Sequence, residues 1–198
     1  MRLVALLALT LTPVLAGCGG LDARAEPPAA GVRDSAIPRD EAVRRFREGL
    51  APADSLAGSA PSLDSLVATF VRAVSASDTA ALAGLAVTRA EFASLYYPTA
   101  TQARPPYDLD PGLMWFMLFE RSNQGVRRAL QRRGGTTMVP VGYDCGSEPQ
   151  REGDNILHGP CLVRWTDERG DTLAERLVGR VLERDGRFKI LSYANELN

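Results

Sequence analysis

The spacing of apolar residues changes once along this chain, and that change limits the fold class. Between Ser62 and Arg133 apolar residues recur three or four positions apart, as on one side of a helix. After Gly135 they alternate in twos, as in strands with two different faces. Helices followed by strands predict an α+β fold, with N-terminal helices packed on one face of a curved, four-stranded antiparallel sheet. We expect one such domain over residues 62–198.

Capping signals mark where each helix should begin. The predicted N-caps are Ser62, Thr88 and Asp110, and Ser77-Asp78 ends the first helix and begins a short one through Leu85. The helix after Thr88 must stop at Tyr97 because Pro98 follows, and the long helix after Asp110 ends at the glycine pair that begins with Gly134. The run from Leu113 to Phe119 is apolar on all sides. We therefore expect other elements to wrap the front of the long helix.

Turn residues suggest how the strands pair. The predicted strands cover residues 137–144, 156–166, 173–183 and 187–194. Asp185-Gly186 is a strong two-residue hairpin signal between the last two strands. This turn pairs Val181 with Ile190, and it sets Gly179 opposite Ser192 on the face that carries Phe188.

Small side chains at Gly179 and Ser192 leave a gap between the sheet and the helices. We expect Trp115 or Phe116 to fill it, and the alternative is an open cavity. If the domain binds a small ligand, the site should lie between the sheet and the long helix, with Tyr193 contributing only if its face turns inward. The predicted pocket residues are Tyr96, Tyr97, Tyr107, Trp115, Glu120, Gly179 and Ser192. A structural role for the three tyrosines of the proline-rich loop, packing that loop on the sheet edge, is the alternative.

The N-terminus resembles that of bacterial lipoproteins. Arg2 precedes an apolar run that is too short to span a bilayer, and Leu15-Ala16-Gly17-Cys18 matches the lipobox of these proteins. The resemblance implies a signal peptide over residues 1–17 and lipidation of Cys18, which would tether the chain to a membrane. Two glycines after the cysteine, with no Asp, imply the outer membrane, facing the periplasm. A plain secretory signal with a chance cysteine is the alternative.

Composition limits the rest of the chain. Residues 18–61 are typical of a tether, rich in Ala, Pro and Gly, with a short helix at 38–50. The other two cysteines, Cys145 and Cys161, are predicted to form a disulfide, and two free thiols are the alternative. A single histidine and no Cys-x-x-Cys offer too few ligands for a metal site. A charge balance of −2 after signal cleavage gives no basic excess for nucleic-acid binding.

The order of elements resembles the nuclear-transport-factor-2-like superfamily, a cystatin-like α+β cone of curved sheet closed over helices. The resemblance covers about residues 62–198. It rests on that order and on the stretch Leu66 to Leu85, where a long helix leads through Ser77-Asp78-Thr79 into a short one. One departure is that a proline-rich loop stands where the family has a strand before the long helix.

The chain offers little catalytic chemistry. His158 is the only histidine, with no assignable partner, and we expect it to be an exposed residue at a strand end. No Gly-x-Ser-x-Gly turn presents a nucleophile, so we assign no catalytic residue and expect no cofactor. We predict a non-catalytic, lipid-anchored envelope domain that binds a small ligand or an unknown envelope protein. The alternative is a dehydratase, isomerase or cyclase that uses Tyr, Glu or His158 in a pocket.

Overall fold

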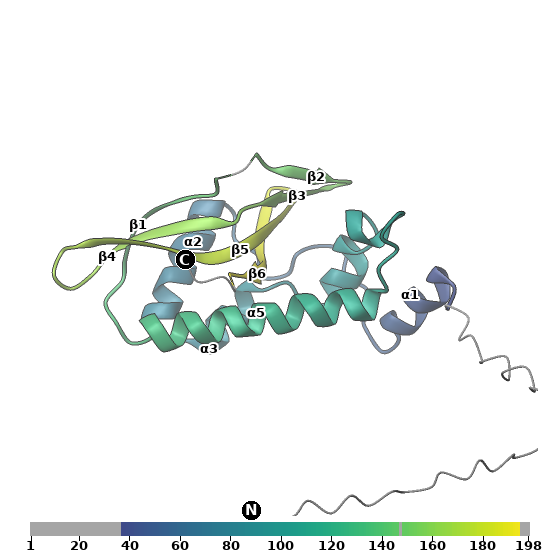
Figure 1. The fold of residues 1–198 in the computed structure, drawn as a ribbon, viewed down its shortest axis with the longest axis horizontal. Helices are drawn as coiled ribbons and strands as arrows, with labels where there is room; N and C mark the ends of the chain where they lie inside the picture. The colour runs from purple at the N-terminus through teal and green to yellow at the C-terminus, as the bar shows by residue number, and fades with distance from the viewer. Residues whose placement is uncertain (1–36, 147, 195–198) are drawn as a thin grey trace, which may run out of the picture. The chain divides into compact units, whose positions relative to one another are not determined.

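A computed structural model describes residues 37–146 and 148–194 of the chain. These residues belong to one compact unit that begins at Ile37. The predicted signal peptide over residues 1–17 and the predicted lipidation of Cys18 fall outside the described residues. Figure 1 shows the long helix α5 beneath the sheet, with α1 near the start of α5.

Three helices begin at the predicted N-caps Ser62, Thr88 and Asp110. In chain order the helices are α1 (Arg39–Arg47), α2 (Leu63–Ser75), α3 (Thr79–Leu85), α4 (Arg89–Glu91), the π-helix η1 (Phe92–Tyr96), the 3-10 helix η2 (Thr101–Ala103) and α5 (Pro111–Arg133). Thr88 and Glu91 form a capping box at α4, and Asp110 accepts two backbone N–H groups at the start of α5.

The sheet has six strands, where the sequence predicted four. They are β1 (Val139–Asp144), β2 (Gln150–Glu152), β3 (Asn155–His158), β4 (Cys161–Thr166), β5 (Thr172–Arg184) and β6 (Arg187–Tyr193). One predicted strand is divided at Gly159-Pro160, where proline has no N–H to donate to a ladder. β2 lies between residues 144 and 156, where the sequence predicted no strand.

All strand pairs are antiparallel. The order is β1-β4-β5-β3-β2, and β6 pairs with β5. β3 and β4 pair with successive parts of the long strand β5. As described, the sheet is not closed, so these residues do not confirm a cone.

The Asp185-Gly186 hairpin was predicted correctly, but its register does not continue along the strand. Val181 pairs with Ile190 as expected. Two register shifts follow, and they set Arg180, not Gly179, opposite Ser192. Gly179 lies at this bulge, where a Cβ would come within 2.8 Å of Ser192 Oγ. A bulge adds an unpaired residue, so the predicted pairing of Gly179 was wrong.

Helices cover both faces of part of the sheet, not the one face that we expected. Val181 and Leu182 are neighbours on β5 and both are fully buried. Because successive residues of a strand point to opposite faces, they enter two different cores. Val181 packs with residues of α2 and α3, whereas Leu182 packs with residues of α1, η1 and the front of α5.

The segment before α2 packs on the domain, although we expected a tether up to residue 61. Phe46 of α1, Leu56 and Ala60 are buried. Ala60 also exchanges two backbone hydrogen bonds of 3.0 Å with Phe188 of β6. The short helix predicted at 38–50 is α1, and the folded unit therefore starts well before Ser62.

A buried ion pair links α4 to the last strand. The Lys189 ammonium group lies 3.0 and 2.9 Å from the two carboxylate oxygens of Glu91. Both side chains are almost completely buried. The same carboxylate accepts the backbone N–H groups of Ala57 and Thr88, so its oxygens are satisfied.

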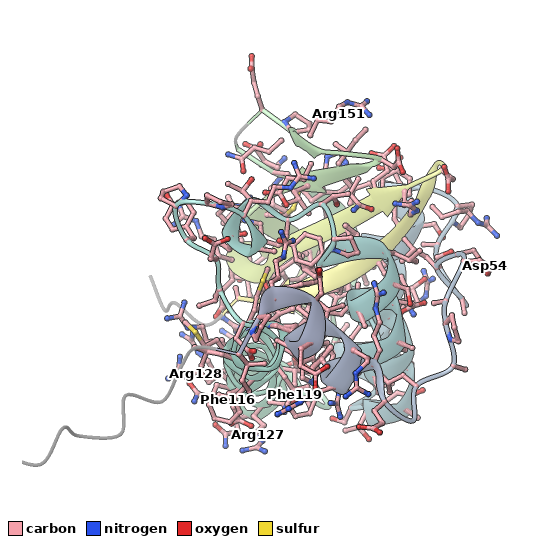
Figure 2. The ribbon with its side chains drawn as sticks, turned by 90° about the vertical axis from the view of Figure 1, so that its right-hand side faces the viewer. Asp54, Phe116, Phe119, Arg127, Arg128 and Arg151 are labelled. Carbon is pink, nitrogen blue, oxygen red and sulfur yellow. A yellow bond between two sulfur atoms is a disulfide. The ribbon has the colours of Figure 1, made fainter. Side chains whose placement is uncertain are left out.

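One side of the front of α5 is exposed, contrary to the expectation that other elements would wrap this part of the helix. Phe116 is 60% exposed, and Leu113 and Phe119 are about half exposed. In Figure 2 the labelled Phe116 and Arg127 lie on the side of α5 away from the sheet. The front of this helix therefore carries an exposed apolar surface.

The predicted disulfide is present. Cys145 directly follows β1 and Cys161 begins β4, and their Cα atoms are 3.9 Å apart. Because β1 pairs with β4, the bridge joins two neighbouring strands.

Candidate ligand-binding site

α5 crosses β6 at close range, and the crossing creates a cleft on each side. Gly125 makes this approach possible, because a Cβ there would collide with the Ala194 carbonyl oxygen. The Ser122 hydroxyl accepts the backbone N–H of Tyr193 at 3.2 Å. Leu118, Leu191 and Tyr193 line both clefts. We call them the sheet cleft, bounded by β3, β5 and α5, and the helical cleft, bounded by α3, α4 and α5.

The sheet cleft has a volume of about 730 Å³ and is open to solvent. Its apolar lining comes mainly from α5 and neighbouring strands, and its polar lining mainly from β2, β5 and β6. The lining residues are Tyr96, Gln102, Leu109, Met114, Met117, Leu118, Arg121, Gln150, Glu152, Leu157, Pro160, Arg176, Gly179, Arg180, Leu191, Ser192, Tyr193 and Ala194.

Three of these lining side chains are arginines and one is a carboxylate. Arg176 and Arg180 come from β5, and Arg121 comes from the opposite wall, on α5. Arg180 is half-buried and donates a 3.2 Å hydrogen bond to Gln150 Oε1. Formal charge in the described lining is therefore positive.

Tyr96 and Glu152 lie close together in the wall of the sheet cleft. Burial raises the pKa of the Tyr96 phenol, and the nearby Glu152 carboxylate raises it further, while Arg180 acts in the opposite direction. Glu152 Oε1 accepts a 2.7 Å hydrogen bond from the Thr101 hydroxyl. Its other oxygen, Oε2, is buried and has no hydrogen-bond partner among the described atoms.

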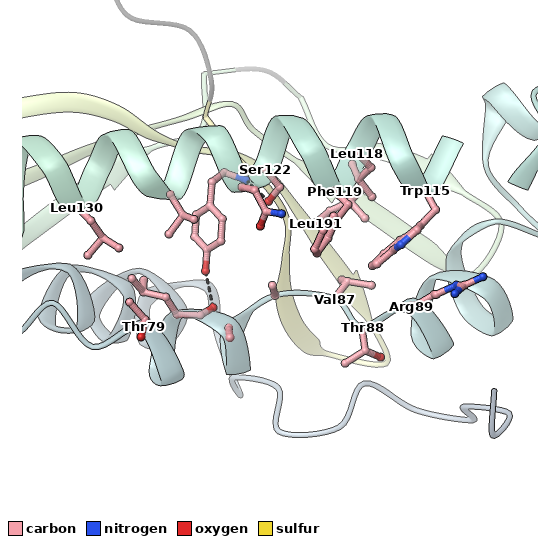
Figure 3. A pocket seen from close by; sticks show the side chains of 16 residues that line it. Thr79, Val87, Thr88, Arg89, Trp115, Leu118, Phe119, Ser122, Leu130 and Leu191 are labelled. Atoms are coloured by element: carbon pink, nitrogen blue, oxygen red, sulfur yellow. Dashed lines mark hydrogen bonds between the residues drawn. The ribbon is translucent and has the colours of Figure 1, made fainter. Parts of the chain in front are cut away.

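The helical cleft is smaller, about 400 Å³, and its lining is more apolar (Figure 3). Trp115 and Arg89 stand at one end and Leu130 at the other. Tyr193 also lines this cleft, and its hydroxyl donates a 2.6 Å hydrogen bond to the Leu82 carbonyl oxygen. Burial raises the pKa of this phenol.

The structure brings together part of the predicted pocket. Tyr96, Gly179 and Ser192 line the sheet cleft, whereas Trp115 lines the helical cleft. Tyr193 lines both, so its face does turn inward.

The remaining predicted residues lie elsewhere. Tyr97 is buried in the core and donates a 2.9 Å hydrogen bond to the Leu109 carbonyl oxygen, which ties down the proline-rich loop. Tyr107 is 65% exposed. Glu120 is exposed on α5 and lines neither cleft. For Tyr97 the structural alternative therefore holds.

The gap beside Gly179 is open, and the expectation that an aromatic residue would fill it was wrong. Trp115 packs against Phe92 instead, with ring centroids 5.2 Å apart. Phe116 points to solvent. The shifted register also places Gly179 and Ser192 in the cleft with Leu157 and Leu191, on the face opposite Phe188.

Sequence reasoning missed the charged residues of the sheet cleft. Arg121, Arg180 and Glu152 are individually typical of ordinary surface charges. The alternation in β5 puts Arg180 on the same face as Leu182, but the gap was expected on the other face, with Val181 and Phe188. Glu152 lies between the first two predicted strands, where the sequence predicted no strand.

His158 does not lie exposed at its strand end, as we had expected. Its Nε2 is 2.6 Å from the Glu183 carboxylate, and its ring packs near Phe188. The histidine lines neither cleft. Among residues 37–146 and 148–194 no three His, Cys, Asp or Glu side chains are placed to hold a metal ion. In the same residues no helix has the length and apolar character to cross a membrane.

No protein-family model, curated protein or solved structure matches this chain.

Proposed function

We propose that this chain is a lipid-anchored protein of the bacterial cell envelope, on the outer membrane facing the periplasm, whose non-catalytic domain binds a small ligand in the sheet cleft. The open space beside Gly179 is the observation that carries the proposal. A volume of about 730 Å³ is within the range of small-molecule sites. Apolar side chains and a few polar groups line the cleft, as in many ligand pockets.

The walls of the cleft come from regular elements, which favours a preformed site. α5 is fixed against β6 at Gly125, and β5 is paired along both edges. A ligand that enters a preformed cleft loses less binding free energy to ordering of the protein.

The anchor rests on the sequence Leu15-Ala16-Gly17-Cys18. Several acyl chains on one cysteine would hold the domain at a membrane essentially permanently, since each buried methylene contributes about 0.8 kcal/mol. Intact-mass analysis should find a mature protein that begins at a modified Cys18. A wild-type protein with an unmodified N-terminus elsewhere would contradict the anchor.

The nuclear-transport-factor-2-like fold also remains a proposal. Two observations support it: a long helix precedes the sheet, and a cleft lies between them. β1 pairs with β4 and β2 pairs with β3, while β4 and β3 both pair with the same edge of β5. With β6 the six strands thus occupy four antiparallel rows, as a four-stranded curved sheet would.

Binding can be tested with two neighbouring positions of α5. Met117→Trp adds bulk to a wall of the sheet cleft, whereas Phe116→Trp alters an exposed side chain one residue away. The full chain in lipid nanodiscs is titrated with octanoate and octanamide by ligand-detected NMR, with empty nanodiscs as background. We expect Met117→Trp to weaken binding of at least one probe and Phe116→Trp to leave it unchanged. Equal effects of both variants, or no binding of either probe, would contradict the proposed site.

A further inference from the structure

We infer that the ligand of the sheet cleft is a small amphipathic anion, with a carboxylate or phosphate group held by Arg180 and Arg121 and an apolar part on α5. This inference rests on the proposed function and names the chemical class of its ligand. It follows from where the charges and the apolar side chains lie within one cleft.

Arg180 is the main anchor for the anionic group. It rises from β5, is half-buried, and is held by a neutral partner, Gln150, at 3.2 Å. Among the described residues it takes part in no ion pair, unlike Arg184 on the same strand, which lies 3.2 Å from Asp154. A guanidinium group offers five N–H donors, so the bond to Gln150 leaves donors for a carboxylate or phosphate.

Arg121 adds positive charge from the opposite wall. It lines the cleft from α5, four residues after Met117, and no described carboxylate pairs with it. An anion between Arg180 and Arg121 would face cations from both the sheet and the helix. A cationic ligand would instead meet a lining in which arginines outnumber the single carboxylate.

The apolar part of the ligand has a defined place beside these charges. Met114, Met117 and Leu118 line the α5 wall, with Leu191 on the adjoining strand. Methionine side chains are flexible and adapt to ligands of different shape. A purely polar anion, such as free phosphate, would leave this wall in contact with water.

Glu152 adds a hydrogen-bond acceptor to the site. Its carboxylate and the Arg180 guanidinium both act on the pKa of the Tyr96 phenol, so this acceptor lies in the same part of the cleft as the main anchor. Because Glu152 Oε2 is a buried acceptor without a described partner, a ligand hydroxyl or amide N–H that reaches it would be favoured.

The test compares matched pairs of anionic and neutral probes on the full chain in nanodiscs. Octanoate is paired with octanamide, and benzoate with benzamide, so that each pair differs mainly in charge. Octanoate represents a lipid-derived acid with an alkyl chain, and benzoate represents a compact soluble acid. The two pairs therefore also distinguish these two sources of ligand. We expect at least one anion to bind more tightly than its amide, and Arg180→Gln to weaken it about tenfold, as expected for loss of a charge-assisted hydrogen bond.

Further variants localise the effect. Arg121→Gln should weaken the same anion about threefold, and Arg180→Lys, which keeps the charge, should retain more binding than Arg180→Gln. Arg127→Gln on the outer side of α5 and Arg89→Gln in the helical cleft are the controls, and neither should change affinity. Thermal melting of each variant confirms that it is folded. If Arg180→Gln does not fold, Arg121→Gln still tests the inference.

Three results would overturn the inference: amides that bind as tightly as their acids, variants of Arg180 and Arg121 that bind as wild type does, or an Arg89→Gln variant that weakens the anion as strongly. If an amide still binds and Met117→Trp weakens it, the cleft remains a ligand site and only the anionic class is wrong. If none of the probes binds, both the class and the site are contradicted.

Discussion

At the scale of single residues, the Glu91–Lys189 pair shows how this fold handles a buried charge. Its two partners are 98 positions apart, and neither charge could be buried alone without a large loss of stability. Contacts of Glu91 with Ala57 and Thr88 extend the pair into a small network. We expect this network to hold α4 against β6.

Replacing Lys189 by Met should therefore be severe. The change leaves the Glu91 carboxylate buried and without its cation, which should lower the free energy of unfolding by about 3–5 kcal/mol. Urea denaturation measures the loss. The control is Asp154→Asn, which removes an exposed partner of Arg184 and should cost less than about 1 kcal/mol. Equal effects at the two sites would mean that the buried pair contributes little.

Tyr193 gives the domain a predictable response to alkaline pH. Burial raises the pKa of its phenol in the folded state, as it does for Tyr96. The stability that a raised pKa contributes is fully present below the unfolded pKa of about 10 and is lost as pH rises above it. The free energy of unfolding should therefore fall once pH exceeds about 10.

Tyr193→Phe is the test of this assignment. It should lower stability near neutral pH by about 1 kcal/mol, because the bond to the Leu82 carbonyl is lost, but it should also flatten the alkaline decline. Urea denaturation at a series of pH values measures both. An alkaline decline as steep in Tyr193→Phe as in the wild type would show that this phenol does not cause it.

At the scale of secondary-structure elements, two glycines in helices should respond to alanine in opposite ways. Gly125 lies where α5 meets β6, and a Cβ there would collide with a backbone oxygen. Gly84 of α3 has open space around it. Gly84→Ala should raise stability by up to about 1 kcal/mol through helix propensity. Gly125→Ala should lower it, because α5 must move away from the strand.

Thermal unfolding of the two variants checks this pair. A stabilising Gly125→Ala would mean that α5 does not approach β6 as closely as described. The same variant also reports on the clefts, since a displaced α5 alters the walls of both.

The elements also show how far sequence reasoning could go. Local signals were sufficient where one turn decides the outcome: the Thr88 capping box, the Asp110 cap and the Asp185-Gly186 hairpin were all predicted. Signals failed where the outcome depends on distant partners. Bulges in β5 shift the register at Gly179, and nothing in the local alternation marks them.

The candidate site was predictable in place but not in chemistry. Gly179 and Ser192 indicated a thin spot between sheet and helix, and the cleft lies there. Trp115 or Phe116 was expected to fill it, but Trp115 packs against Phe92 of η1 and Phe116 is exposed. Arg180 was not foreseen, because an arginine on a strand usually lies in solvent and the cleft was expected on the other face of β5.

At the scale of the whole molecule, the proposed anchor and the cleft define one account. The anchor would fix the domain at a membrane, and the cleft would hold a small ligand. The ligand-binding part of this account depends on one claim, that the space beside Gly179 is open and binds a ligand.

Ser192→Cys tests that claim most directly. The introduced thiol would line the sheet cleft, while the native pair Cys145–Cys161 stays oxidised and Cys18, if lipidated, has no free thiol. The control is Ala83→Cys, in the helical cleft. In nanodiscs, iodoacetamide should modify the thiol of Ser192→Cys readily, and octanoate or benzoate should slow that reaction without slowing the modification of Ala83→Cys. A thiol in Ser192→Cys that does not react, or that reacts at the same rate with and without either probe, would contradict the account.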